Sequence, residues 1–360
     1  MRKKLDKDYL ISLFSSIFLA FCVGALIMLI CGYNPIDCYA KLFVGALGTP
    51  FALGNTLEKM MVLALCGLAM CVAAQAGIFN VGGEGQLFMG ALAAAVVGAQ
   101  VKNVPPWVVV ILALLAAVAA GGLYAWIPGA MKVYWKVDEV ITTIMLNSAA
   151  IFFCSYMANG PLKTAEKGIA VGTDSIMPEA AFAKIIPMSN LTTAIIYSAV
   201  VALFVWYLMT RSATGYEMKL TGNNERFAKY GGISSKKLML LGMVLSGAIC
   251  GLCGMLEIFG LHKRFITTIS NEFYFDGMLV AMIMRYSPFG TIVMSLFFAV
   301  LNIGGKAMQL SAGISSEVIQ IVQSVIIFFM AAEGGIRTML KEKAALRKAR
   351  VEAARKEALQ

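Results

Sequence analysis

Charged side chains are scarce in this sequence of 360 residues, and only one histidine is present. Asp, Glu, Lys and Arg make up 14% of the residues, whereas an ordinary soluble domain contains about 25%. Apolar residues reach 59%, and the mean hydropathy is +0.79. A water-soluble fold of this composition would expose large hydrophobic patches. The composition therefore excludes a soluble enzyme and indicates an integral membrane protein.

Motifs for catalysis and nucleotide binding are also missing. Because His262 is the only histidine, the sequence has no HExxH motif, no Cys/His metal spacing and no Ser-His-Asp set. No stretch matches GxxxxGK[ST], whose glycine-rich backbone cradles phosphates in P-loop ATPases. The eight cysteines lie mostly in apolar runs, and we interpret them as small buried hydrophobic residues. We expect this chain to have no enzyme activity, no metal and no cofactor of its own.

Long apolar runs are what the sequence has in place of these motifs. A membrane-spanning helix needs about 20 apolar residues, so the runs predict an all-α polytopic membrane protein with about ten transmembrane helices. The eighth is the shortest, because its apolar core would extend only about 18 Å as a helix. It begins earlier, in the polar stretch after Phe265, or it is a half-helix packed inside protein. The predicted spans are 10–31, 60–76, 80–99, 107–131, 140–158, 191–210, 238–260, 273–284, 289–304 and 317–332.

The distribution of Lys and Arg indicates the orientation. By the positive-inside rule, segments rich in these residues lie in the cytoplasm, which places both termini inside a multi-pass plasma-membrane protein. The same rule explains the net charge of +10 without a nucleic-acid partner. Twenty-one of the 30 Lys and Arg residues lie in the segments 1–9, 132–138, 211–237, 285–288 and 333–360.

This topology predicts one transmembrane domain, 10–332, between a cytoplasmic N-terminus, 1–9, and a basic cytoplasmic tail, 333–360. The domain carries an outer loop at 159–190 and an inner loop at 211–237. Spans two to five and spans seven to ten then start in opposite directions. That arrangement is typical of an inverted repeat around a binding site near the membrane midplane.

Residues 77–86, GIFNVGGEGQ, place glycines and polar side chains between two apolar runs. Non-helical backbone at membrane depth survives only where protein or a water-filled cavity surrounds it, and buried ionisable groups there often mark a functional path. One interpretation is a broken helix in which Phe79, Asn80, Glu84 and Gln86 line the solute pathway. The other is a tight turn near the inner face, where Glu84 caps the following helix through its dipole.

Two further patterns lie within predicted spans. Asn147 places an amide in the fifth span, where it either bonds across helices or faces a polar solute. Gly247, Gly251 and Gly254 follow one another at helical spacing in the seventh span. Such a smooth face lets a second helix approach closely, so we expect these glycines to serve helix packing.

The inner loop contains a short amphipathic stretch. Charged Glu225, Arg226 and Lys229 are mixed with Phe227, Ala228 and Tyr230. Asn223 or Asn224 can cap the start, and Gly231 follows the end. One interpretation is a docking helix for a soluble partner. The other is a helix that lies on the membrane surface.

Together these segments resemble the permease subunits of ABC importers in the branched-chain amino acid/ribose permease superfamily. The resemblance covers roughly residues 10–335 and is closest to the nucleoside-type branch, which carries guanosine and other purine nucleosides. Sugar and branched-chain amino acid permeases share the scaffold and remain alternatives, and a secondary transporter is a weaker one. The motifs that carry the resemblance are GIFNVGGEGQ at 77–86, VDEVITTIMLN at 137–147, LTGNN at 220–224, AKYGGI at 228–233, SGAICGLCG at 246–254 and FDGMLVAMIMR at 275–285.

The resemblance implies a type II importer permease without an ATPase of its own. Partner cytosolic ABC ATPases would bind ATP and Mg²⁺, and the chain would work with a second permease subunit and an extracellular solute-binding lipoprotein, surrounded by membrane lipids. It would move solute inward by alternating access. In this family the inner loop couples the permease to the ATPase, which assigns that role here to Glu217, Gly222, Asn223, Glu225, Arg226, Tyr230 and Gly231.

Overall fold

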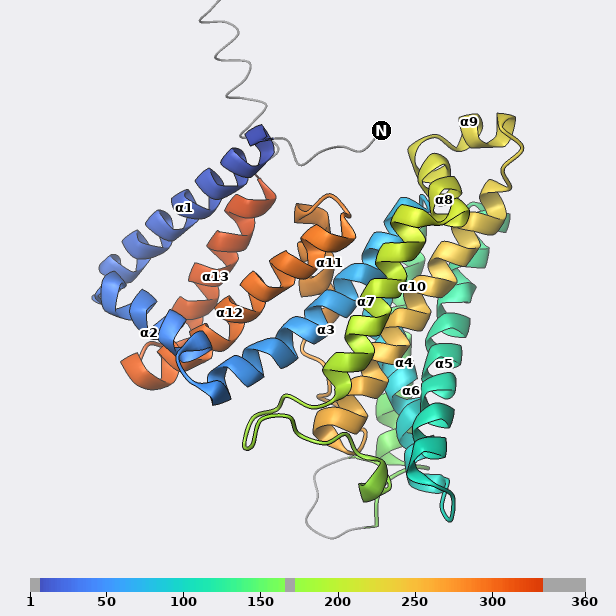
Figure 1. The fold of residues 1–360 in the computed structure, drawn as a ribbon, viewed down its shortest axis with the longest axis horizontal. Coiled ribbons are helices and arrows are strands. Elements are labelled where there is room, and N and C mark those ends of the chain that lie inside the picture. Colours follow the sequence, from blue (N-terminus) through green and yellow to red (C-terminus); the bar gives the residue numbers. More distant parts are fainter. Residues whose placement is uncertain (1–6, 166–171, 333–360) are drawn as a thin grey trace, which may run out of the picture. The chain divides into compact units, whose positions relative to one another are not determined.

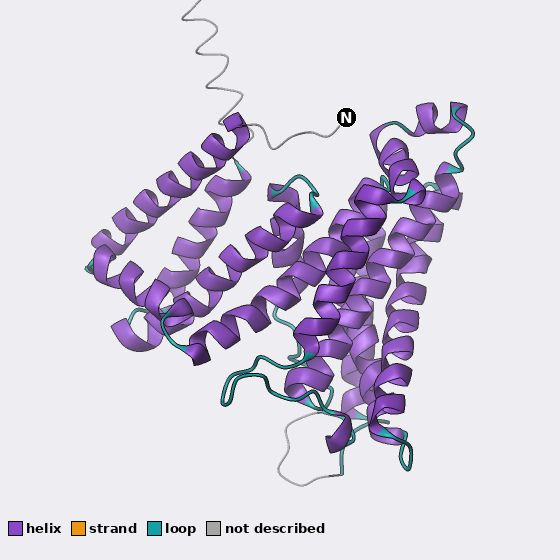
Figure 2. Cartoon of the chain, in the orientation of Figure 1, coloured by secondary structure: helices purple, strands orange, loops and turns teal. Residues whose placement is uncertain are grey.

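The computed structural model describes residues 7–165 and 172–332. The predictions for residues 1–6, for 166–171 of the outer loop and for the tail 333–360 lie outside this part. Within it, the chain forms helices joined by loops and contains no β-strand (Figure 2). The helices of more than one turn are α1 Lys7–Ile30, α2 Pro35–Leu47, α3 Pro50–Gln75, α4 Gly83–Gln100, α5 Pro106–Trp135, α6 Glu139–Asn159, α7 Ala194–Arg211, α8 Ala213–Asn223, α9 Glu225–Tyr230, α10 Ser235–Glu257, α11 Phe273–Ile283, α12 Pro288–Ala312 and α13 Ser316–Ala331.

The prediction of an all-helical membrane protein is confirmed. Within residues 7–165 and 172–332, six helices are long and apolar enough to cross a membrane, or seven if the bent pair α1–α2 counts as one span. The count of ten spans and the inverted repeat stay predictions. α11 has 11 residues, about 17 Å at the usual helical rise. It is therefore a half-helix, the second of the two forms expected for the eighth segment.

Two of the departures from the predicted helices have identifiable physical reasons. α2 was not predicted, because Asp37 and Lys41 interrupt its apolar pattern; they form an ion pair one helical turn apart, at 2.7 Å. α3 begins ten residues before the predicted start. Its first turn is capped by Thr49, whose hydroxyl accepts a hydrogen bond from Ala52 N, and the helix then runs through the charged pair at 58–59.

The described chain divides into two compact units. One contains residues up to Gly45 and from Gly304 onward, and the other contains Ala46–Ile303. In the first unit α1 packs against α13. The hydroxyl of Tyr39 on α2 donates a hydrogen bond to Phe21 O on α1 at 2.8 Å, and α2 turns away from α1 by 119°.

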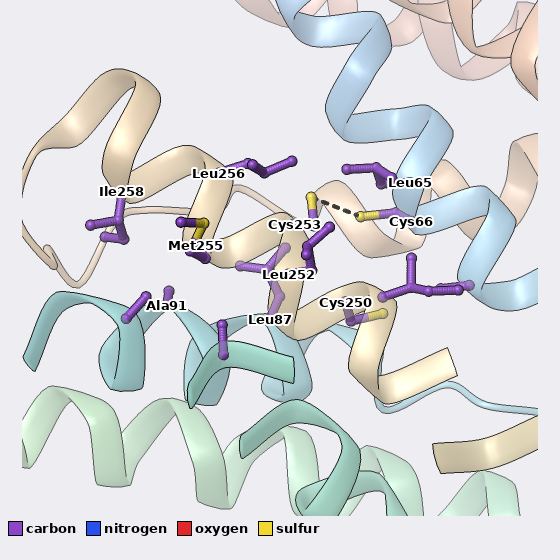
Figure 3. Close-up of a cluster of buried hydrophobic side chains, with 14 of the residues drawn as sticks. Leu65, Cys66, Leu87, Ala91, Cys250, Leu252, Cys253, Met255, Leu256 and Ile258 are labelled. Carbon is purple, nitrogen blue, oxygen red and sulfur yellow. Dashed lines mark hydrogen bonds between the residues drawn. The ribbon is translucent and has the colours of Figure 1, made fainter. Parts of the chain in front are cut away.

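In the second unit α10 is the central helix, and it packs against α5, α4 and α3 (Figure 1). After Glu257 it continues as one π-helical turn, Ile258–His262. Figure 3 shows part of its core, where Cys66 of α3 faces Cys253 of α10 with the sulfur atoms 4.0 Å apart. Both cysteines and Cys250 are fully buried free thiols. They fill the same apolar layer as Leu65 and the neighbouring α10 side chains.

Candidate functional site

The loop between α3 and α4 is non-helical from Ala76 to Gly82 and turns at Gly77, whose φ is +85°. Asn80 organises this loop from within, since it is fully buried. Its amide nitrogen donates to Gln86 Oε1 and to Ser246 Oγ, both at 2.9 Å. Its amide oxygen accepts from Gly82 N at 2.9 Å and from Gln86 Nε2 at 3.1 Å. One side chain thus joins the loop, the start of α4 and the middle of α10.

Asn147 of α6 holds the same loop from the other side. Its amide oxygen accepts from Gly85 N at 2.7 Å, and its amide nitrogen donates to Val81 O at 2.8 Å. The side chain is 6% exposed. Asn147 was expected either to bond across helices or to face a polar solute. In this structure its side chain bonds to the first turn of α4 and to the loop.

Glu84 connects the start of α4 to the start of α11. Its carboxylate accepts a hydrogen bond from Tyr274 N at 3.0 Å, which is one of the free N–H groups at the N-terminal end of α11. The hydroxyl of Tyr274 returns to the loop and donates to Asn80 O at 2.6 Å. Glu84 also lies in the first turn of its own helix. Its carboxylate therefore bonds to the first turn of α11, and the expected dipole effect on α4 stays a prediction.

We call these six residues the polar network: Asn80, Glu84, Gln86, Asn147, Ser246 and Tyr274. Four of the five residues predicted to line a pathway belong to it. The fifth, Phe79, is half-buried and packs against Met70 and Cys71 in a separate apolar cluster. The polar groups of the network bond to one another or to the backbone of the loop and of the start of α4, so the network holds α4, α6, α10 and α11 around one loop. Their contact with a solute stays a prediction.

Two members of the network were not singled out from the sequence. Ser246 stood beside a glycine series that was interpreted as a packing face, and Tyr274 stood in the short eighth segment. Each of the two residues places a single hydroxyl inside an apolar run. A buried hydroxyl needs a hydrogen-bond partner, so this was the signal that could have identified them. Nothing in the sequence names that partner, which lies 166 residues away for Ser246.

The inner loop forms two helices, α8 and α9, which lie at the ends of α7 and α10 (Figure 1). We call Ala213–Tyr230 the docking segment. The short helix predicted there is confirmed, and its cap is Asn224, whose side chain accepts from Phe227 N at 3.0 Å. Tyr230 is 93% exposed and Phe227 is 62% exposed. The segment therefore presents aromatic and charged side chains outward.

The docking segment rests against the ends of two long helices. The Lys219 amine donates a hydrogen bond to Met209 O in the last turn of α7, and burial lowers the pKa of this amine. At Gly222 the backbones come closer still. A Cβ atom placed on Gly222 would lie 2.5 Å from Gln75 O and 3.0 Å from Gly77 N. Gly222 thus touches the loop whose next residues carry the polar network.

The three glycines of α10 that were expected to serve packing, Gly247, Gly251 and Gly254, lie where other helices approach closely. A Cβ atom on Gly247 would lie 2.5 Å from Gly121 O of α5, and one on Gly251 would lie 2.3 Å from Ala117 O. On Gly254 it would lie 2.3 Å from Leu87 O of α4. Real Cβ atoms do not approach backbone this closely, so all three positions admit only glycine without a shift of the helices.

Comparison with known proteins adds two kinds of similarity, to a protein family and to individual relatives. The model of the family described as "Branched-chain amino acid transport system / permease component" matches residues 52–331. The chain is 33% identical to the guanosine ABC transporter permease protein NupP of Bacillus subtilis, over 90% of this chain and 94% of that protein. It is 32% identical to the nucleoside ABC transporter permease protein NupB of Lactococcus lactis, over 95% of each. It is 31% identical to the glucose ABC transporter permease protein TsgB13 of Haloferax volcanii, over 88% and 85%.

Proposed function

The chain belongs to the family of branched-chain amino acid transport system permease components, and from this premise we propose that it is the nucleoside-translocating permease of an ABC importer. Membership makes it a multi-pass membrane subunit of a transporter rather than an enzyme. Two relatives whose names give guanosine or nucleoside transport match nearly the whole chain. They support a nucleoside as the solute, and the glucose permease supports a sugar as the second candidate.

The contact between Gly222 and the loop after α3 carries the mechanism that we propose. Partner ATPases dock on the cytoplasmic face against the exposed side chains of α9, and their closure on ATP moves the docking segment. Because Gly222 leaves no space between α8 and the Gln75–Gly77 backbone, that movement displaces the loop. The loop is bonded to α6, α10 and α11 through the polar network, so the displacement alters the packing of those helices. A second permease subunit and an extracellular solute-binding lipoprotein complete the importer.

Uptake of labelled guanosine tests the solute. The chain is expressed with its neighbouring transporter genes in a bacterium whose own nucleoside uptake has been deleted. We expect energy-dependent accumulation that excess unlabelled nucleoside abolishes and excess glucose or leucine leaves unchanged. Competition by glucose, without competition by nucleosides, would replace the nucleoside by a sugar and leave the permease assignment intact.

Replacing Gly222 with alanine is expected to uncouple ATP hydrolysis from transport. The new methyl group meets the Gln75 carbonyl, which is backbone and cannot rotate away, so α8 must lift from the loop. We expect nucleoside uptake to fall about tenfold or more, while the assembled complex still hydrolyses ATP. Lifting α8 from the loop in this way requires about 1–3 kcal/mol, which is the strain that overpacking typically generates.

Gly122→Ala is the matched control for the Gly222 variant, because its methyl group has its nearest neighbour at an ordinary 3.4 Å. Unchanged uptake in the Gly222 variant would contradict the coupling route.

A further inference from the structure

Lys59 is a charged residue inside a helix that is apolar enough to span the membrane. It lies nine residues after Pro50 in α3, about 14 Å along the helix axis. Its side chain is 7% exposed. A buried charge in such a segment is costly and marks a functional position unless a partner explains it. None of the roles described above uses this lysine.

The ammonium of Lys59 lies over the face of the Phe273 ring, 3.2 Å from the ring centroid. Phe273 is the first residue of the half-helix α11. A cation over an aromatic face is attracted by the ring quadrupole, and the attraction grows when both groups are removed from water. The contact therefore joins α3 to the beginning of α11. Four residues after Phe273 on α11, the backbone of Gly277 also meets the backbone of Gly67 on α3.

Carboxyl groups from three other helices lie within electrostatic range of this cation. Lys59 interacts electrostatically with Glu84 of α4, Glu257 of α10 and Asp276 of α11. Glu257 is 2% exposed, and its Oε2 lies 3.9 Å from Nε2 of His262. Besides His262, the other titratable groups that interact with these carboxyls are Glu58, Glu272, Cys250 and Cys253. Acidic groups thus outnumber the basic ones around Lys59, and removing its charge leaves buried carboxyls without compensation.

We propose that Lys59 is a positioning residue of the translocation machinery, which holds the first turn of α11 in place through the Phe273 ring and the surrounding carboxyls. The consequence reaches the polar network directly. The residue after Phe273 is Tyr274, whose backbone N–H bonds to Glu84 and whose hydroxyl bonds to Asn80 O. A displaced first turn of α11 would break both bonds. The expected effect of Lys59 on uptake rests on the proposed transport function. Its electrostatic interactions with Phe273 and the carboxyls do not depend on which solute is carried.

The test replaces Lys59 by methionine, which keeps the length of the side chain and removes the charge. In the assembled transporter we expect the maximal uptake rate to fall about tenfold, with the half-saturating concentration of solute-loaded binding protein unchanged. K59R keeps a cation over the ring and should restore most of the rate. K41M is the matched control, because Lys41 pairs with Asp37 where both side chains are partly exposed. Its uptake should equal that of the unaltered chain.

A second readout needs no transport and separates this inference from the proposed function. In the purified protein we expect K59M to lower the Tm by about 5 °C or more, since removing a buried cation leaves the nearby buried carboxyls without an opposite charge. Removing one carboxyl in the double variant K59M/E257Q should recover much of that loss. A side chain that served packing alone would show no such recovery. K59M with an unchanged Tm, or a double variant no better than K59M, would overturn the proposal.

If K59M does not accumulate, the ring can be varied instead. F273Y keeps an aromatic face beneath the ammonium and should retain uptake and Tm. F273L keeps an apolar side chain without a ring quadrupole, and we expect it to lower both. Equal behaviour of F273L and the unaltered protein would overturn the proposal. Absence of nucleoside uptake by the unaltered transporter would overturn the proposed function alone, because the Tm comparisons would still decide the role of Lys59.

Discussion

Adding one methyl group at Gly251 is expected to remove most of the folded protein from the membrane. Gly251 lies where α10 meets α5 and α4: its Cβ would lie 2.3 Å from Ala117 O, and a Cβ on Gly90 would lie 2.2 Å from the Gly251 Cα. Alanine in a helix interior gains about 0.5–1 kcal/mol over glycine. Overpacking against backbone costs roughly 1–3 kcal/mol and occasionally more. Because the α5 backbone at Ala117 cannot move aside without a shift of the whole helix, we expect the strain to exceed the gain.

Gly122→Ala provides the control for this substitution. Gly122 lies on α5 and faces the same helix, α10, but its added methyl group would have Val244 Cγ1 as nearest neighbour at 3.4 Å. The helix-propensity gain should therefore remain, and we expect equal or slightly higher stability. The measurement is the yield and Tm of detergent-solubilised protein by size-exclusion chromatography. Equal behaviour of the two variants would show that close helix approach at Gly251 is not needed for folding.

The second large effect is expected from Asn147→Leu. Leucine fills a similar volume but leaves Gly85 N and Val81 O without the bonds that Asn147 now makes. Each unsatisfied buried group costs about 1–3 kcal/mol, so the loss should reach roughly 2–6 kcal/mol. The loop between α3 and α4 would then lose its attachment to α6. We expect nucleoside uptake to disappear and the Tm to fall.

Asn159→Leu is the matched control on the same helix. Asn159 is the last residue of α6, and its side chain is exposed and donates only to Ser155 O within its own helix. Thermal unfolding and guanosine uptake of the two variants can be compared directly. An Asn147 variant with normal Tm and normal uptake would mean that the polar network is dispensable for both fold and transport.

Much of the fold was predictable because the membrane imposes one solution on the chain. Apolar runs of about 20 residues must form helices, and the predicted bounds of α6 differ from the observed ones by one residue at each end. The error at α3 has a different origin. Glu58 and Lys59 look like the polar edge of a span, and only the folded protein shows that Lys59 is buried against Phe273.

The candidate site was predictable as a set of residue types and not as a geometry. Glycine and amide side chains at 77–86 indicated interrupted backbone, and the structure contains that interruption. The partners of Asn80 and Glu84 come from α10 and α11, at separations of 166 and 190 residues. Side-chain pairing over such separations depends on helix packing, which no local pattern encodes. For the same reason, the close backbone contact between Gly222 and Gln75 could not be predicted from the sequence.

Uptake by purified components in lipid vesicles tests most directly whether this chain is a permease driven by a partner. The chain is reconstituted alone, and then together with its proposed partners: an ABC ATPase, a second permease subunit and a guanosine-loaded binding protein. We expect guanosine uptake only in the complete set and only with ATP, and no ATP hydrolysis by the chain alone. Guanosine movement by the isolated chain under an ion gradient, or nucleotide hydrolysis without the ATPase subunit, would contradict the assignment.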